Sequence, residues 1–325
     1  RTMSNAAALA AIEYEVESSA ANWGEDVTTF GTHLSVRGEP DVTMLHEKEP
    51  ADRMQEYRTG GEPPVLMTQG GAFTTTHDLV RGTTMVGSPA VSPLGTLWGI
   101  ALANASALSL ATSTTFTGGT AAVPTTTAAS GVADGGMVRA GALGDGDGNG
   151  QFYVAASHAA NALTLIGDLD GAPAAAQVVY PVEMVYPTTA ATATDITGAR
   201  FRFLSGNLGY EAHGVFATGY EISGINTGER PTVKITWSVS WWRHTATTLP
   251  SLAAAAHYNP APIAAGSFNV QLVGTTTRQK YTIRGLTVAH TLNVAPQMGP
   301  GGLKQHQKII GAKKAGHDAV AMTFT

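Results

Sequence analysis

Between residues 199 and 242 the chain alternates apolar and polar side chains with a period of two, which strongly restricts what it can fold into. Phe201 and Phe203 are separated by Arg202 and preceded by Arg200. A second run places apolar residues at every other position: Val233, Ile235, Trp237, Val239 and Trp241. Such alternation is typical of strands buried on one face, so we predict three strands here and a sheet with one packed side.

Glycines and other turn residues divide these runs: Gly214, Gly219, Gly224 and Gly228, with Asn226 and Pro231. They supply the positive or fixed φ angles that hairpin turns need. This glycine-spaced course resembles the closing hairpins of the tail tube (major tail) proteins of long-tailed bacteriophages. The resemblance covers most of the chain in the order of its elements and is strongest over 71–82 and 131–242.

The resemblance implies a mainly β fold, an antiparallel β-sandwich or barrel of the tail-tube type. It also implies one flanking helix, a small β-insertion, an extended loop and a C-terminal arm. Residues 1–130 and 170–325 would form the main tail-tube domain, and 131–169 the insertion. Because 39 residues bury little core, we expect the insertion to lean on the main domain or on a neighbouring subunit.

The function implied by the resemblance is assembly. Proteins of that family form hexameric rings that stack into a hollow tube, a conduit for DNA into the host. The expected partners are copies of the chain within and between rings, other tail proteins (terminator, tape measure, baseplate or tip) and DNA in transit. The expected location is the virion tail, assembled in the host cytoplasm, with no enzymatic activity and no cofactor.

The composition favours a protein that packs against its own copies. Charged residues make up 13% of the chain, against roughly 25% in a typical soluble domain, and the surface must therefore be largely neutral. Such a surface is poor at keeping molecules apart. The chain has no cysteine, which excludes disulfides, thiolate nucleophiles and cysteine-based zinc sites. An ordinary extracellular β-protein remains the alternative.

Charge is distributed unevenly along the chain. Residues 1–62 hold twelve acidic and five basic residues, a net charge of −7, whereas 303–325 carry a net charge of +3. Opposite signs would favour one polarity in a head-to-tail stack. The candidate assembly residues are Glu47, Glu49 and Glu56 on the acidic side and Lys304, Lys308, Lys313 and Lys314 on the basic side. Solvated charges on flexible ends are the alternative interpretation.

Shorter patterns predict the remaining elements. We expect strands at 12–16, 34–37, 41–45 and 71–82, the last with Leu79 and Val80 buried, and at 268–272, 281–286, 288–294 and 319–325. Apolar residues from Leu94 to Leu108 recur at helical spacing behind Pro93 and predict one helix. Residues 112–129 are expected to form a linker. Four strands are expected in the insertion, with the apolar positions Val138, Phe152, Val154, Leu163 and Leu165.

One segment partly matches the sequence pattern of a calcium-binding loop. Asp145, Asp147 and Asn149 match the first oxygen ligands of a calcium loop, but Ala156 stands where the bidentate glutamate belongs. An exposed turn of the same composition is the preferred interpretation. None of the ten histidines shows a ligand-pair spacing, and no nucleophile elbow or phosphate loop is present.

Neither a membrane span nor a secretory leader is expected. The apolar run 97–111 is too short and too polar to cross about 30 Å of hydrocarbon. The chain opens Arg1-Thr2-Met3 without a charged leader and an apolar stretch behind it.

A rival hypothesis is a capsid decoration or host-glycan-binding virion protein. By parity, Trp237 and Trp241 belong to the packed face while Trp242 points outward, where it could stack on a sugar. In the tail-tube hypothesis the lumen should be neutral or acidic, because duplex DNA is densely negative. Arg200 and Arg202 would conflict with that expectation if their face lined the bore.

Overall fold

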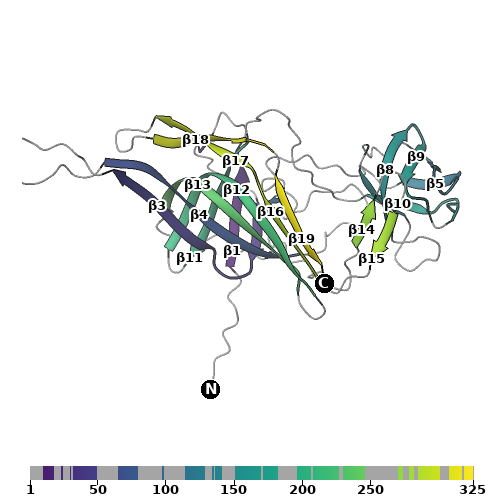
Figure 1. Cartoon of the computed structure of the whole chain (residues 1–325), viewed down its shortest axis with the longest axis horizontal. Helices are drawn as coiled ribbons and strands as arrows, with labels where there is room; N and C mark the ends of the chain where they lie inside the picture. The colour runs from purple at the N-terminus through teal and green to yellow at the C-terminus, as the bar shows by residue number, and fades with distance from the viewer. Residues whose placement is uncertain are drawn as a thin grey trace, which may run out of the picture.

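A computed structural model shows a protein built almost wholly from antiparallel strands (Figure 1). It describes residues 10–17, 23–24, 30, 32–49, 65–79, 97–98, 114–128, 134, 136–140, 151–169, 171–181, 196–205, 208–226, 230–245, 270–273, 278–281, 285–300, 307–316 and 318–324. The mainly β class predicted from the sequence is confirmed.

The largest unit is a nine-stranded sheet. Its main path runs in the order β2 (Thr32–Val36), β1 (Ala10–Val16), β11 (Ala199–Ser205), β12 (Leu208–Asn226), β13 (Thr232–Thr245), β4 (Val65–Asp78) and β3 (Asp41–Glu49). Two more strands, β16 (Gly285–Thr291) and β19 (Ala319–Phe324), extend it from β12. The three strands predicted for 199–242 are confirmed.

The sheet curves back on itself. Strands β2 and β3 are at opposite ends of its main path, yet only residues 37–40 separate them in the chain. The Arg37 amide donates to the Thr76 carbonyl of β4 at 2.7 Å, and the Arg37 guanidinium lies 3.7 Å from the Asp78 carboxylate. The curvature therefore encloses one apolar core between the two halves of the path.

Aromatic side chains from distant strands fill that core. Phe73 packs against Phe201, Phe203 and Trp237 with ring centroids 4.9–6.1 Å apart. The Trp237 indole donates to Thr75 Oγ1 at 2.9 Å, so its buried polar atom is satisfied. Phe201 and Phe203 face inward and Arg200 and Arg202 outward, as the alternation predicted.

The predicted orientations of Trp241 and Trp242 are wrong. Trp242 is 7% exposed and packs on Phe73, whereas Trp241 is half-buried and stacks on His213, 3.6 Å between ring centroids. The alternation changes phase where Gly214 takes a φ of 57°, a conformation that favours glycine. Ser240 Oγ donates to the Gly214 carbonyl at 2.9 Å and holds the irregularity. Because of this phase change, the indole of Trp242 faces the core.

A glycine on β4 makes room for this indole. A Cβ at Gly71 would lie 2.7 Å from Trp242 Nε1, closer than real Cβ atoms approach. The core therefore depends on the absence of a side chain here.

A second unit is a closed six-stranded barrel with its own core. Its order is β10 (Val178–Pro181), β5 (Thr114–Gly119), β6 (Pro124–Thr126), β9 (Ala162–Ile166), β8 (Gln151–Ala159) and β7 (Met137–Ala140). Figure 1 shows it at one end of the molecule, apart from the large sheet. Phe116, Val138, Tyr153 and Leu163 are among the buried residues inside it.

The barrel corrects two expectations. The predicted linker 112–129 contains β5 and β6, so the barrel begins before and ends after the predicted insertion 131–169. Tyr153 and Ala155 belong to the barrel core and Val154 between them does not, while the side chain of Phe152 lies outside the description. The reason is register: Val138 pairs directly with Tyr153, and directly paired residues share a face.

Two hairpins complete the described fold: β14 (Val270–Val273) with β15 (Arg278–Tyr281), and β17 (Val294–Pro300) with β18 (Gln307–Lys314). Leu97 and Trp98 are helical, and the rest of the predicted helix 94–108 lies outside the described residues. The predicted strands at 12–16, 34–37, 41–45 and 319–325 are confirmed. Strand β4 ends before Leu79, which is half-buried, and Val80 lies outside the description.

Candidate assembly surface

Strand β12 branches the large sheet. Its first half pairs with β11 from Leu208 to Val215, and its second half pairs with β16 from Gly219 to Asn226. Its other edge pairs with β13 almost throughout. At 19 residues it is long enough to serve two partners in succession, so β16 and β19 project as an extension.

The core face of the sheet continues without interruption onto this extension. One row of directly paired residues runs Ile235, Tyr220, His290 and Val320, and the next runs Val233, Ile222, Val288 and Met322. Residues paired in this way share a face of the sheet. Val233 and Ile235 are at most 1% exposed, whereas Val320 is 53% and Met322 58% exposed. The same apolar surface is thus buried at one end and open at the other.

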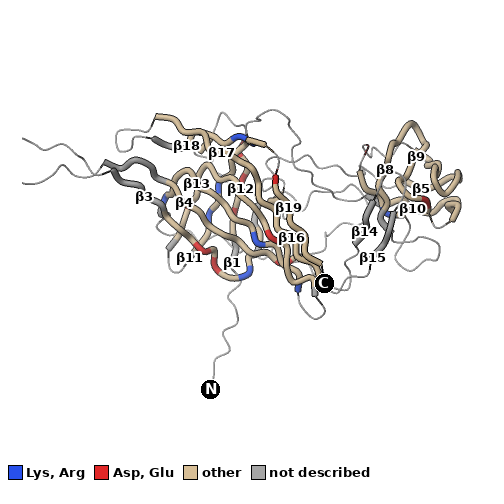
Figure 2. Tube along the Cα trace, viewed as in Figure 1, with Lys and Arg blue, Asp and Glu red and all other residues tan. Residues whose placement is uncertain are grey.

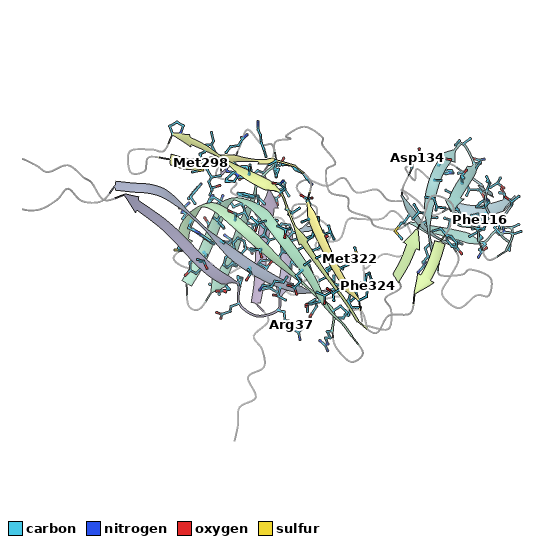
Figure 3. All side chains as sticks on the ribbon, viewed as in Figure 1. Arg37, Phe116, Asp134, Met298, Met322 and Phe324 are labelled. Carbon is cyan, nitrogen blue, oxygen red and sulfur yellow. The ribbon has the colours of Figure 1, made fainter. Side chains whose placement is uncertain are left out.

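Strand β19 is an open edge. Val320, Met322 and Phe324 lie on the core side by their pairing register and are about half exposed. Figure 3 labels Met322 and Phe324 on this strand. Among the described strands, β19 pairs only with β16. Residues 319–324 contain no charge and no proline, the devices that normally keep an edge strand from pairing with another chain. We call β19, with these three side chains, the β19 edge.

The opposite edge of the same sheet is β3. In the described part of the chain β3 pairs only with β4, and its Val42 and Met44 pack against the main core. Thr43 between them is exposed on the other face. The order β3-β4-β13-β12-β16-β19 therefore forms one antiparallel sheet that is apolar on the same face at both edges.

A cluster of charges fixes the start of β19. The Asp318 carboxylate accepts hydrogen bonds from Lys314 Nζ at 2.7 Å and from the Asn293 amide at 2.9 Å. His290 Nε2 lies 3.2 Å from the same carboxylate. The side chains of Lys314, Asp318 and His290 are each at most 7% exposed. This cluster joins β18 and β19 to the end of β16.

The environment of Asp318 favours its ionised form. Burial alone would raise the pKa of Asp318, but the hydrogen bonds from Lys314 and Asn293 and the charges of Lys314 and His290 outweigh it. The pKa therefore lies below its ordinary value. The ion pair with Lys314 is intact at neutral pH.

Tyr220 marks the border between the closed core and the extension. Trp98 packs edge-on against its ring, 5.3 Å between centroids, and His290 contacts it at 5.0 Å. Burial raises the pKa of Tyr220, the hydrogen bond with Trp98 lowers it, and the charge of Asp318 raises it further. The phenol thus remains neutral beside the charged cluster.

The other branch of the sheet carries buried ion pairs. Arg200 Nη2 lies 2.9 Å from Glu211 Oε2, and Arg202 Nε donates to Glu13 Oε2 at 2.6 Å. The Phe30 ring lies over both guanidinium groups, 5.1 and 4.5 Å from its centroid. These charges neutralise one another, and in Figure 2 blue and red segments occur next to each other across the sheet.

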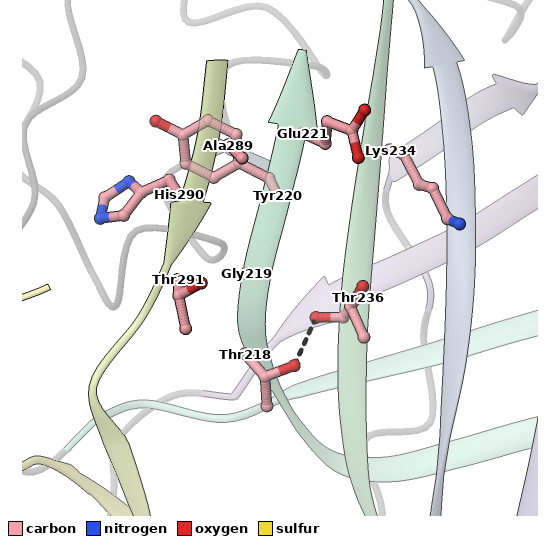
Figure 4. A pocket seen from close by; sticks show the side chains of 9 residues that line it. All are labelled: Thr218, Gly219, Tyr220, Glu221, Lys234, Thr236, Ala289, His290 and Thr291. Atoms are coloured by element: carbon pink, nitrogen blue, oxygen red, sulfur yellow. Dashed lines mark hydrogen bonds between the residues drawn. The ribbon is translucent and has the colours of Figure 1, made fainter. Parts of the chain in front are cut away.

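A shallow, open hollow of about 290 Å³ lies across β12, β13 and β16 (Figure 4). Thr218 Oγ1 donates to the Thr236 carbonyl at 3.3 Å on its floor, and Glu221 and Lys234 lie along its side. The residues that line the hollow supply hydroxyl groups, the imidazole of His290 and one pair of opposite charges.

The structure places the candidate residues unevenly. Glu47 and Glu49 lie on β3, and Lys308, Lys313 and Lys314 lie on β18. Glu56, Lys304 and the calcium candidates Asp145, Asp147 and Asn149 lie outside the described residues. The expected C-terminal arm is folded where it is described: β18 pairs with β17, and Lys314 is buried. The role of these residues in assembly stays a prediction.

The β19 edge itself was not among the predicted site residues. A signal for it exists in the sequence, since 319–325 combine alternating apolar residues with a complete absence of charge. Alternation alone does not distinguish a strand that is buried from one that is left open.

Other classes of site find no support among the described residues. No group of three or more His, Asp or Glu side chains there could hold a metal ion. Within the same residues, none of the helical stretches has the length and apolar character needed to cross a bilayer. No protein-family model matches the chain, and no curated protein matches it in sequence. A function must therefore be inferred from the geometry of the sheet.

Proposed function

We propose that this chain is a structural virion protein that assembles into stacked rings forming a phage tail tube, through which DNA passes into the host. The observation that carries the proposal is the β19 edge, where the core face of the sheet ends at a strand that, among the described strands, is paired on one side only and whose apolar side chains are about half exposed. The tail-tube resemblance of 71–82 and 131–242 supplies the architecture.

Pairing of β19 with β3 of the next copy is the contact that the sheet favours. Both edges are apolar on the same face, so Val320, Met322 and Phe324 would meet the neighbour's Val42 and Met44. A junction of this kind between two different edges is heterologous, and it forms a ring when the rotation from one copy to the next divides a full turn. Closure of such a ring removes the open edges of β3 and β19.

Burial at this junction is favourable. Full burial of a large apolar side chain contributes about 1.5–3 kcal/mol, and each of these three side chains, already about half buried, would contribute roughly half of that. Backbone hydrogen bonds along β19 would add to this at each pairing position. Multiplied around a ring, these contributions favour assembly over a free monomer.

The proposed partners follow from this architecture. Copies of the chain would be contacted within and between rings, and terminator, tape measure and baseplate or tip proteins at the ends of the tube. The proposed location is the virion tail. The glycan-binding alternative loses its main support, because Trp242 is packed inside the core.

The test is assembly of the purified protein with one charge added at the edge. Met322→Lys places an ammonium group in the apolar row and should abolish rings and tubes, because the charge cannot enter the contact without losing its hydration. Assembly is followed by light scattering behind size exclusion and by electron microscopy.

The matched control is Thr117→Lys, which adds the same charge to an exposed strand position of the closed barrel. This variant should assemble as the unmodified protein does. A wild-type protein that remains monomeric, or a Met322→Lys variant that still forms tubes, would refute the proposal.

A further inference from the structure

The face of the extended sheet opposite the core carries few charges. Its side chains come from five strands and are mostly hydroxyls and methyls: Thr74 and Thr76 on β4, Thr232 and Thr236 on β13, Ser223 on β12, Thr287, Ala289 and Thr291 on β16, and Ala319, Ala321 and Thr323 on β19. We call this set the hydroxyl face.

The pairing register shows that the hydroxyl face is continuous. One row of paired residues runs Thr74, Thr236, Gly219, Thr291 and Ala319 from β4 to β19. Side chains in a row lie about 5 Å apart, so threonine hydroxyls and small uncharged residues form a continuous surface across the strands. The hollow at Gly219 lies within this surface (Figure 4).

Most of the charges that occur here are next to an opposite charge. Lys234 pairs directly with Glu221 across β12 and β13, and Asp78 at the end of β4 lies 3.7 Å from the Arg37 guanidinium. Asp41 on β3 pairs directly with Thr74 and adds one exposed carboxylate at the edge of this face. The hydroxyl face therefore carries matched charges and a single additional negative charge.

We infer that the hydroxyl face lines the bore of the assembly and is the surface past which duplex DNA moves, an inference that rests on the proposed tail-tube function. Ring closure through β19 turns one face of the extended sheet toward the axis and the other away from it. The core face is apolar and needs dry contacts, whereas the hydroxyl face is compatible with water.

This surface suits passage of a polyanion. A basic wall would release counterions and hold the duplex, with an affinity that rises steeply as salt falls. Threonine hydroxyls make exchangeable hydrogen bonds with water and offer phosphates no fixed cation. Arg200 and Arg202 do not disturb this arrangement, since they lie on the other branch of the sheet and are paired with Glu211 and Glu13.

The first experiment adds positive charge to the proposed bore so that it retains DNA. Thr291 is exposed on the hydroxyl face, and Thr291→Lys would place one new cation per subunit around the axis. Assembled Thr291→Lys rings are mixed with short linear duplex or with closed circular duplex at low salt, and binding is followed by fluorescence anisotropy and gel shift. Thr117→Lys on the barrel is the matched control.

The expected result is selective retention of linear DNA. Thr291→Lys rings should bind linear duplex at least about tenfold more tightly than the unmodified rings, with a steep salt dependence. They should not bind the closed circle comparably, because a circle cannot thread a closed ring. Thr117→Lys should show no difference between the two DNA forms.

Intact Thr291→Lys rings that hold no DNA, or that hold circles and linear duplex equally, would overturn the bore assignment while leaving assembly established. If the unmodified protein forms no rings, the proposed function and this inference fail together.

A second variant makes the assignment independent of DNA. Because the chain has no cysteine, Thr291→Cys and Thr117→Cys each provide a single thiol. After assembly both are treated with a small biotin-maleimide and then with streptavidin, which is too large to enter the bore. Streptavidin should bind the Thr117→Cys tubes at once and the Thr291→Cys protein only after dissociation. Equal binding to both kinds of intact tube would refute the inference.

Discussion

The closed barrel and the open sheet differ in how the backbone edges of their strands are paired. In the barrel, each of the six strands has two neighbours, so no backbone edge is left for another chain. In the large sheet, β19 has one neighbour within the described residues and shows its apolar side chains to solvent. The difference teaches that the barrel strands are all paired within the barrel, whereas the large sheet leaves an edge that we propose a copy completes.

The two units can be followed separately because all five tryptophans lie outside the barrel strands, at positions 23, 98, 237, 241 and 242. Tryptophan fluorescence therefore reports on the large sheet. Far-ultraviolet circular dichroism reports on both units.

The largest effect is expected from Trp237→Ala in the core of the open sheet. Trp237 is fully buried, stacks on Phe73 and donates to Thr75, so its removal leaves a cavity and takes one hydrogen bond from the Thr75 hydroxyl. The free energy of unfolding should fall by about 3–5 kcal/mol, measured by urea titration of the remaining tryptophan fluorescence. Assembly should weaken with it. An unchanged titration midpoint would show that the aromatic core does not stabilise the sheet.

A smaller and more local effect is expected from Leu163→Ala inside the barrel. Leu163 is fully buried, and its loss should destabilise the barrel by about 2–4 kcal/mol, seen in circular dichroism. Tryptophan fluorescence and ring formation should stay unchanged, because the barrel supplies no open edge. If Leu163→Ala prevented assembly, the separation between a complete unit and an incomplete one would be wrong.

The smallest effect is expected from Asp318→Asn at the start of β19. Loss of the charged partner of Lys314 should cost about 1–3 kcal/mol at neutral pH. The folded state lowers the pKa of Asp318, so this contribution exists above the ordinary aspartate pKa and disappears as pH falls through the lowered value. Urea titrations of wild type and variant should therefore converge in strong acid. A constant difference across all pH values would exclude the carboxylate as its source.

The sequence predicted those elements in which side-chain alternation and burial coincide. Phe201 and Phe203 face the core because their strand stays regular. Trp241 and Trp242 lie on the faces opposite to those predicted, because the positive φ of Gly214 permits an irregularity in the strand pair. The sequence shows that a glycine is present but not which φ it adopts. Alternation predicts orientation only up to the next bulge.

Strands β5 and β6, which were not predicted from the sequence, lack an alternating apolar pattern. Strands β5 and β6 are rich in threonine, and Phe116 is the large apolar residue that they bury. Their outer face is held by hydroxyl pairs, with Thr115 and Thr127 Oγ1 atoms 2.6 Å apart and Thr117 and Thr125 Oγ1 atoms 3.0 Å apart. Threonine favours strands through its branched Cβ, a preference that a search for apolar periodicity does not register.

The candidate assembly surface shows a further limit of sequence reasoning. Val320, Met322 and Phe324 alternate with small residues in the same way as the buried residues of β13. Their exposure follows from topology, because β19 is the last strand added beyond β16. Charge-based reasoning instead selected Lys314, which the structure buries beside Asp318.

Hydrogen–deuterium exchange of the β19 amides, compared between assembled and dissociated protein, tests the pairing of this edge most directly. We predict that amides of 319–324 and of β3 exchange much more slowly after assembly, while those of the barrel strands exchange at the same rate in both states. Assembled particles in which 319–324 exchange as fast as in the monomer would contradict the account.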